Sequence, residues 1–179
     1  MLIFISGASR SGKSEFAEDI CGRLCGVNGR KIYLATAQVY DDDMRRRVER
    51  HKFMRRDKNF VTIEKTHNLH EILDLIDLND NILLECLPNW AANELFIDEN
   101  LNSLKDLDYI KAKIFNAVID LNLKVKNLII VSDDIFADGK IYDDMTESYI
   151  KLLAELHVMI AAQADKAIEC ASGLAYYFK

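Results

Sequence analysis

The clearest chemical signature in the sequence is an octapeptide near the start of the chain. Gly7-Ala8-Ser9-Arg10-Ser11-Gly12-Lys13-Ser14 fits the pattern G-x-x-x-x-G-K-[ST] at each defined position, after an apolar run and before a helix-like segment. Glycines let backbone N–H groups turn toward phosphate oxygens, the lysine brings a positive charge to the β- and γ-phosphates, and the serine hydroxyl can ligate Mg²⁺. The octapeptide predicts a loop that binds a nucleoside triphosphate, GTP or ATP.

Acidic residues follow two apolar runs that read as later strands. Glu85 closes the run Ile82-Leu83-Leu84, where an ionised carboxylate is costly unless it faces a metal, a ligand or the end of the strand. Asp133 and Asp134 follow the run Leu128–Val131 in the same way. We expect Glu85, with Ser14, to hold Mg²⁺ directly or through water, with the two aspartates as a second candidate pair. Helix capping or a solvated strand end is the alternative.

A basic segment supplies the second candidate centre. Eight basic residues and two acidic ones lie between Met44 and Lys58, in a chain whose net charge is −6. This concentration suggests a site for a small polyanion, although a solvated helix face remains the alternative. His51 shares the apolar stripe of the expected helix with Met44, Val48 and Met54, which is typical of a core histidine. Neighbouring arginines would lower the pKa of its imidazole and keep it neutral, the form that can attack phosphorus.

The remaining histidines and the cysteines carry weaker signals. His67, His70 and His157 show no zinc-protease spacing, so structural roles are expected for them. The four cysteines lack a C-x-x-C spacing and are expected to be buried thiols, as suits a reducing cytoplasm.

Composition limits the class of protein. A chain of 179 residues, half of them hydrophobic, can bury one sizeable core, so we expect a single domain covering residues 1–179. No apolar stretch approaches the roughly 18 residues of a membrane span, and no signal-like segment opens the chain. The acidic balance argues against general nucleic-acid binding. We expect a cytoplasmic protein without a membrane span.

Short apolar runs alternate with amphipathic segments along the chain. Strands are expected at Leu2–Ser6, Lys31–Ala37, Val61–Glu64, Ile82–Cys86, Leu128–Val131 and, last, Ala167–Ala171. Helices are expected at Gly12–Cys25, Asp41–Arg56, Leu69–Ile76, Trp90–Phe96, Tyr109–Leu121 and Tyr142–Ala164, with a polar surface loop at Asp98–Asp108. This alternation predicts an α/β P-loop fold with a mostly parallel sheet covered by helices on both faces.

Taken together, these residues resemble one known family. Seven segments occur in a characteristic order along the chain: the P-loop, Tyr33-Leu34-Ala35-Thr36-Ala37-Gln38, Asp42-Asp43-Met44 with Arg47, Arg50 and His51, Thr62-Ile63-Glu64, Leu83-Leu84-Glu85-Cys86, Val131-Ser132 and the terminal Ser172-Gly173…Lys179. This order resembles the bifunctional adenosylcobinamide kinase / adenosylcobinamide-phosphate guanylyltransferase family across the whole chain.

The resemblance implies a RecA-like domain, commonly trimeric, that acts on a corrinoid in cobalamin synthesis. A triphosphate would phosphorylate the adenosylcobinamide hydroxyl with the help of Lys13. His51 would then take GMP from GTP and pass it to adenosylcobinamide phosphate. Beyond the P-loop, the resemblance assigns guanine-nucleotide binding to the following residues: Ala37, Gln38, Val39, Lys52, Phe53, Met54, Arg55, Glu64 and Glu85.

The sequence departs from the family pattern at several places, most clearly in the stretch after Leu128–Val131. Where the family usually has Val-Ser-Asn-Glu-Val-Gly, this chain has Val131-Ser132-Asp133-Asp134-Ile135-Phe136. The residues alone therefore leave open whether both activities are kept, whether ATP or GTP is preferred, and which residues contact the corrinoid. They also allow two other classes: a different P-loop small-molecule kinase with His51 in its core, and a nucleotide-dependent switch module.

Overall fold

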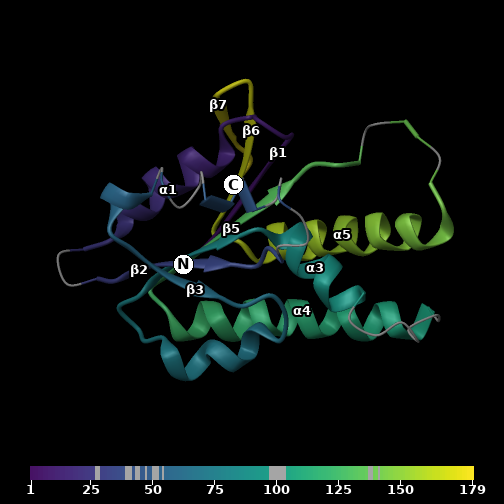
Figure 1. The fold of residues 1–179 in the computed structure, drawn as a ribbon, viewed down its shortest axis with the longest axis horizontal. Helices are drawn as coiled ribbons and strands as arrows, with labels where there is room; N and C mark the ends of the chain where they lie inside the picture. The colour runs from purple at the N-terminus through teal and green to yellow at the C-terminus, as the bar shows by residue number, and fades with distance from the viewer. Residues whose placement is uncertain are drawn as a thin grey trace.

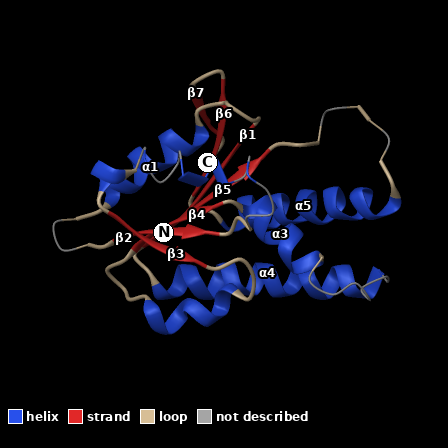
Figure 2. Cartoon of the chain, viewed as in Figure 1, coloured by secondary structure: helices blue, strands red, loops and turns tan. Residues whose placement is uncertain are grey.

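The computed structural model contains one seven-stranded sheet between two layers of helices. It describes the whole chain except residues 27, 28, 39–41, 43, 44, 47, 50–52, 54, 97–103, 137, 138 and 141, and except the side chains of 104–106. The strand order is β3-β2-β4-β5-β1-β6-β7. All neighbouring strands pair in parallel except β6 and β7, which are antiparallel. Figure 2 shows the strands running through the centre with helices on either side, as predicted.

The strands agree closely with the apolar runs. They are β1 (Leu2–Gly7), β2 (Lys31–Ala35), β3 (Phe60–Glu64), β4 (Asn81–Glu85), β5 (Asn127–Asp133), β6 (Lys166–Ala171) and β7 (Leu174–Tyr177). The expectation that β6 is the last strand was wrong. Ser172 and Gly173, both with positive φ, turn the chain back so that β7 forms the sheet edge. Tyr176 and Tyr177 are exposed there, so β7 lacks the buried pattern by which the other strands were predicted.

The helices are α1 (Lys13–Leu24), α3 (Leu87–Leu95), α4 (Leu104–Lys124) and α5 (Asp144–Gln163), with 3-10 helices η1 (Arg56–Lys58) and η2 (Leu69–Leu75). The predicted loop Asp98–Asp108 was wrong over residues 104–108, because α4 begins at Leu104. The helix expected at Leu69–Ile76 is of the tighter 3-10 type. In the expected helix Asp41–Arg56, the described residues from Asp42 to Phe53 are helical.

Each face of the sheet buries its own core. Alternate strand residues such as Ile5, Leu83 and Val131 pack against α1, while Phe4 and Leu84 pack on the opposite side against α3, α4 and α5. Figure 1 shows α1 on one side of the sheet and α3, α4 and α5 on the other. All four cysteines are free thiols, and three of them are buried. Among the described residues, no helix has the length and apolarity needed to cross a membrane.

Candidate functional site

The parallel register collects the candidate residues at one edge of the sheet. Glu64, Ala35, Glu85 and Val131 form a continuous row of paired positions across β3, β2, β4 and β5. Residues in one row point to the same face, so both glutamates lie on the face covered by α1, about 10 Å apart at two strand spacings. The P-loop leaves β1 at the same edge and leads into α1. The carboxyl edge of the sheet is therefore the candidate site.

Glycines shape the loop between β1 and α1. A Cβ atom at Gly7 would clash with the Cys170 carbonyl oxygen, so the close approach of β6 excludes any side chain there. Gly12 has φ 91°, a left-handed conformation that favours glycine, and caps the N-terminus of α1. Lys13 Nζ donates to the Ala8 carbonyl oxygen at 3.2 Å across the loop. The helix N-terminus and its free N–H groups thus face the space where a phosphate would bind.

Two polar contacts connect the loop to the neighbouring strands. Ser14 Oγ donates to Glu85 Oε1 at 2.6 Å, and Lys13 Nζ forms an ion pair with Asp133 Oδ1 at 2.5 Å. The candidate acids Glu85 and Asp133, both predicted from sequence, therefore meet the P-loop. The neighbouring Asp134 is exposed, and its backbone N–H donates to the Gly7 carbonyl oxygen at 3.0 Å.

Burial dominates the electrostatics of Glu85. It raises the pKa of this carboxyl to about 7, although the Ser14 hydrogen bond and the charge of Lys13 both favour the ionised form. Glu85 Oε2 is buried and has no hydrogen-bond partner among the described residues. A buried carboxylate oxygen beside a serine hydroxyl suits a hard cation. In the described part of the chain, no group of three or more His, Cys, Asp or Glu could hold a metal, so phosphate oxygens and water would have to complete the coordination of Mg²⁺.

The basic segment is only partly described. Val39, His51, Lys52 and Met54 lie outside the described residues, so their predicted roles stay predictions. Phe53 is exposed, whereas Arg55 is buried with its guanidinium carbon 3.4 Å from the centre of the Tyr33 ring. Ala37 and Gln38, just beyond β2, are both partly exposed.

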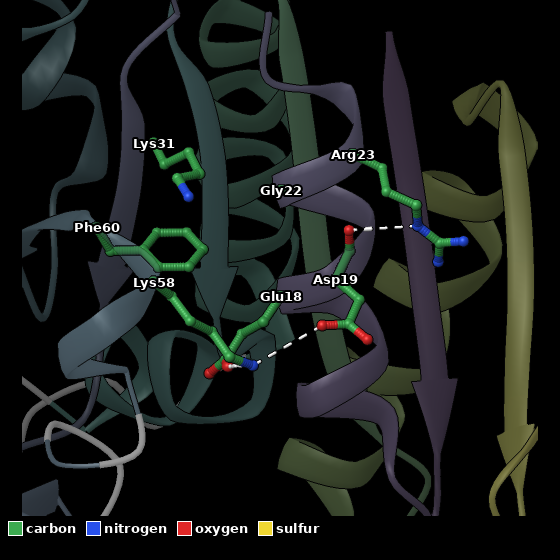
Figure 3. A pocket seen from close by; sticks show the side chains of 7 residues that line it. All are labelled: Glu18, Asp19, Gly22, Arg23, Lys31, Lys58 and Phe60. Carbon is green, nitrogen blue, oxygen red and sulfur yellow. Dashed lines mark hydrogen bonds and ion pairs between the residues drawn. The ribbon is translucent and has the colours of Figure 1, made fainter.

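A pocket of about 520 Å³ lies away from this edge. It opens between the later turns of α1 and the first residues of β2 and β3. Figure 3 shows the Lys58 amino group between the carboxylates of Glu18 and Asp19, with the Phe60 ring beside them. Lys58 Nζ is 2.7 Å from Glu18 Oε2 and 3.8 Å from Asp19 Oδ1. Lys58 is thus paired with α1 rather than directed to the P-loop.

One contact near the site was not predicted from sequence. Ser132 Oγ and His157 Nε2 are 2.6 Å apart, next to Asp133, and the His157 ring packs edge-on against Phe4 and Phe136. Burial lowers the pKa of His157 to about 4, so this imidazole is neutral. One indication of this contact was present in the sequence: His157 is a polar residue on the buried side of α5.

Among solved structures, an ATPase domain has a similar fold. The TM-score is 0.52 at 12% identity, covering 94% of this chain and 68% of that one. The likeness shows the fold alone and confirms the predicted RecA-like P-loop architecture.

Sequence comparisons identify closer relatives. The Bifunctional adenosylcobalamin biosynthesis protein CobU of Escherichia coli (strain K12) is 37% identical over 97 residues, and that of Salmonella typhimurium is 36% identical over 111 residues. These alignments span 54% and 61% of this chain, and only 51% and 58% of the two relatives. The Bifunctional adenosylcobalamin biosynthesis protein CobP of Pseudomonas aeruginosa is 28% identical over 172 residues, covering 95% of this chain and 92% of that protein.

The family model described as Cobinamide kinase / cobinamide phosphate guanyltransferase matches residues 3–177, nearly the whole chain. Its match includes the P-loop, Glu85 and Asp133, the three elements that meet at the carboxyl edge of the sheet. The chain therefore belongs to the cobinamide kinase / cobinamide phosphate guanyltransferase family.

Proposed function

We propose that this protein phosphorylates adenosylcobinamide and then converts the product to adenosylcobinamide-GDP in cobalamin synthesis. The contact between Ser14 Oγ and Glu85 Oε1 carries the proposal, because it joins the P-loop to an acidic strand end in the arrangement that phosphoryl transfer requires. Family membership over residues 3–177 supplies the substrate class. The protein would act as a single domain in the cytoplasm and, by the family resemblance, as a trimer.

In the first reaction, the substrate hydroxyl oxygen attacks the γ-phosphorus of ATP or GTP. The new O–P bond replaces the bond to the β-phosphate oxygen, the nucleoside diphosphate leaves with that electron pair, and the hydroxyl proton passes to solvent. Lys13 exchanges Asp133 for phosphate oxygens and stabilises the charge that develops on them. The P-loop N–H groups hold the same phosphates.

Ser14 and Glu85 would hold Mg²⁺ for this step, directly or through water. The buried Glu85 Oε2, without a hydrogen-bond partner in the described chain, fits that role. When bound, the cation would offset negative charge on the phosphate oxygens.

In the second reaction, the neutral imidazole of His51 attacks the α-phosphorus of GTP. A P–N bond forms, the bond from the α-phosphorus to the bridging oxygen breaks, and pyrophosphate leaves with its electron pair. A phosphate oxygen of adenosylcobinamide phosphate then attacks the same phosphorus, and the imidazole departs as the leaving group. Beyond the P-loop, the guanine nucleotide would be held by these residues: Ala37, Gln38, Val39, Lys52, Phe53, Met54, Arg55, Glu64 and Glu85.

Incubation with α-³²P-labelled GTP and Mg²⁺ tests the second reaction. The wild-type protein should acquire a label that is labile to acid and stable to alkali, as expected of a phosphoramidate. His51→Ala should remain unlabelled, while His70→Ala, which changes an exposed histidine, should be labelled normally. A folded wild-type protein that acquires no label would rule out the histidine intermediate. Phosphorylation of another alcohol, with adenosylcobinamide left unmodified, would instead favour a different P-loop kinase.

A further inference from the structure

A buried amide connects two loops that leave the carboxyl edge of the sheet. Asn93, on α3, donates through Nδ2 to the Thr36 carbonyl oxygen at 2.7 Å and to the Thr66 carbonyl oxygen at 2.9 Å. Thr36 follows β2 and Thr66 follows β3. Both N–H bonds of one neutral nitrogen are thus used to fix the distance between two backbone segments. Asn93 itself is only 8% exposed.

The same network continues to β4. The Thr36 backbone N–H donates to the Glu85 carbonyl oxygen at 3.1 Å, and Thr36 Oγ1 donates to the Cys86 carbonyl oxygen at 2.8 Å. Thr36 Oγ1 also accepts the Cys86 backbone N–H at 2.8 Å. Thr36 is fully buried, so water does not compete for these bonds. The ends of β2, β3 and β4 are therefore fixed relative to one another through Thr36 and Asn93.

The fixed segments border the residues to which the proposed function assigns the guanine nucleotide. Ala37 and Gln38 directly follow Thr36, Glu64 lies two residues before Thr66, and Glu85 is bonded to Thr36 through its backbone. The two hydrogen bonds of the Asn93 amide nitrogen go to these loops and not to the P-loop. A change at Asn93 would therefore move the β2 and β3 loops while leaving the P-loop in place.

We propose that Asn93 is a positioning residue for guanylyl transfer, which acts by holding the Thr36 and Thr66 carbonyl groups at a fixed separation. The inference rests on the proposed function. Its chemistry is specific, because two facing carbonyl oxygens need two donors and a primary amide supplies both without adding charge. Loss of the amide leaves the buried Thr36 carbonyl oxygen and the partly buried Thr66 carbonyl oxygen without this donor. The loops would then relax, and a shift of about 1 Å in a reacting group can reduce a rate about 100-fold.

The test compares Asn93→Ala with Asn127→Ala. Asn127 is also a buried asparagine, and its Nδ2 donates to Asn81 Oδ1 at 2.6 Å, but at the amino edge of the sheet. Both variants remove a buried amide, so a loss of stability alone should affect them similarly. We expect Asn93→Ala to form the ³²P-guanylyl adduct at least about tenfold more slowly at saturating GTP. Transfer of the γ-phosphoryl group from saturating ATP to adenosylcobinamide should change less than about threefold, and Asn127→Ala should retain both rates.

When the wild type is labelled, two results would overturn the inference. The first is an unchanged labelling rate in Asn93→Ala. The second is that guanylyl labelling and γ-phosphoryl transfer slow equally in Asn93→Ala and slow to the same extent in Asn127→Ala. If the wild-type protein itself is not labelled, the proposed guanylyl step fails and this inference fails with it. Labelling of the wild type therefore distinguishes failure of the proposed function from failure of the inference alone. If Asn93→Ala does not fold, Asn93→Ser, which retains one short donor in the same space, takes its place with the same expected split between the two reactions.

Discussion

The two halves of the candidate site are held together by different chemistry. On the P-loop half, charged groups make the contacts: Lys13 pairs with Asp133, and Ser14 donates to Glu85. On the β2–β3 half, neutral hydrogen bonds from Asn93 fix the backbone of the two loops. The charged contacts involve side chains that would bind a nucleotide and its metal. The neutral hydrogen bonds involve no such side chain.

This difference separates the part of the site that must rearrange from the part that is already formed. A triphosphate would engage the Lys13 ammonium group, which is paired with Asp133 in this structure, so binding would change the ionic partners of the lysine. The Asn93 and Thr36 bonds can persist through the same event. We therefore expect substitutions in the P-loop half to alter nucleotide binding and transfer, and substitutions around α3 to alter stability or geometry.

The largest expected effect is that of Lys13→Ala. Removal of the cation that stabilises transferred charge should lower γ-phosphoryl transfer to adenosylcobinamide by about 100-fold or more. Initial rates with ATP, Mg²⁺ and adenosylcobinamide measure it. Lys31→Ala, at the first residue of β2 on the opposite edge of the sheet, serves as the control and should keep its rate. A Lys13→Ala rate within tenfold of the wild type would show that the charged half does not carry the transfer.

Next in size is the effect of Glu94→Ala on stability. Glu94 Oε1 accepts from the Asn68 backbone N–H and Trp90 Nε1, and Oε2 accepts from Lys113 Nζ, all within 3.0 Å. Burial alone would raise the pKa of Glu94, but these bonds hold it below its usual range. The substitution leaves two donors and a cation unpaired, so we expect the free energy of unfolding to fall by about 3 kcal/mol.

Urea denaturation measures this loss. Glu155→Ala, which removes a partly exposed partner of Lys111, should cost less than about 1 kcal/mol. Equal losses in the two variants would contradict the view that α3 is anchored by its buried contacts.

A smaller effect, of opposite sign, is expected from Asp133→Asn. The substitution releases Lys13 and removes a negative charge beside the incoming phosphates, so nucleotide affinity should rise about fivefold, equivalent to roughly 1 kcal/mol. Isothermal titration calorimetry with ATP or GTP measures it, with Asp134→Asn as a control because Asp134 is exposed. Weaker binding in Asp133→Asn would instead indicate that this carboxylate helps to hold the metal.

A further expected effect, on stability alone, is a pH dependence due to Glu85. Its pKa is about 7 in the folded protein, against an ordinary value of 4.5. Between these values the unfolded chain loses the proton while the folded chain keeps it, so stability falls as the pH rises from about 4.5 to about 7. Glu85→Gln removes this titration, so between these pH values its Tm should fall by a few °C less than that of the wild type. Thermal unfolding of both proteins from pH 5 to pH 8, without nucleotide or metal, measures this difference. Parallel plots of Tm against pH for the wild type and Glu85→Gln would contradict the assignment.

Prediction from sequence succeeded where local pattern and burial coincide. The runs that became β1, β4 and β5 were recognised because each of these strands contains three or four consecutive buried apolar residues, and the P-loop was recognised by its motif. β7 was missed because an exposed edge strand lacks that pattern. The first turn of α4 was missed because it lies in the stretch Asp98–Asp108, in which eight of eleven residues are polar. The role of His51 still rests on sequence, since His51 lies outside the described residues.

The sequence by itself determined the nucleotide loop, the strand ends that carry Glu85 and Asp133, and the family to which the chain belongs. These features depend on residue type and on spacing along the chain, which local physical rules can interpret. Only the tertiary structure decided that Glu85 meets Ser14, that Asp133 pairs with Lys13, and that Asn93 holds the loops of two strands. These contacts join residues between 27 and 120 positions apart, and only the order and register of the strands bring such distant residues together.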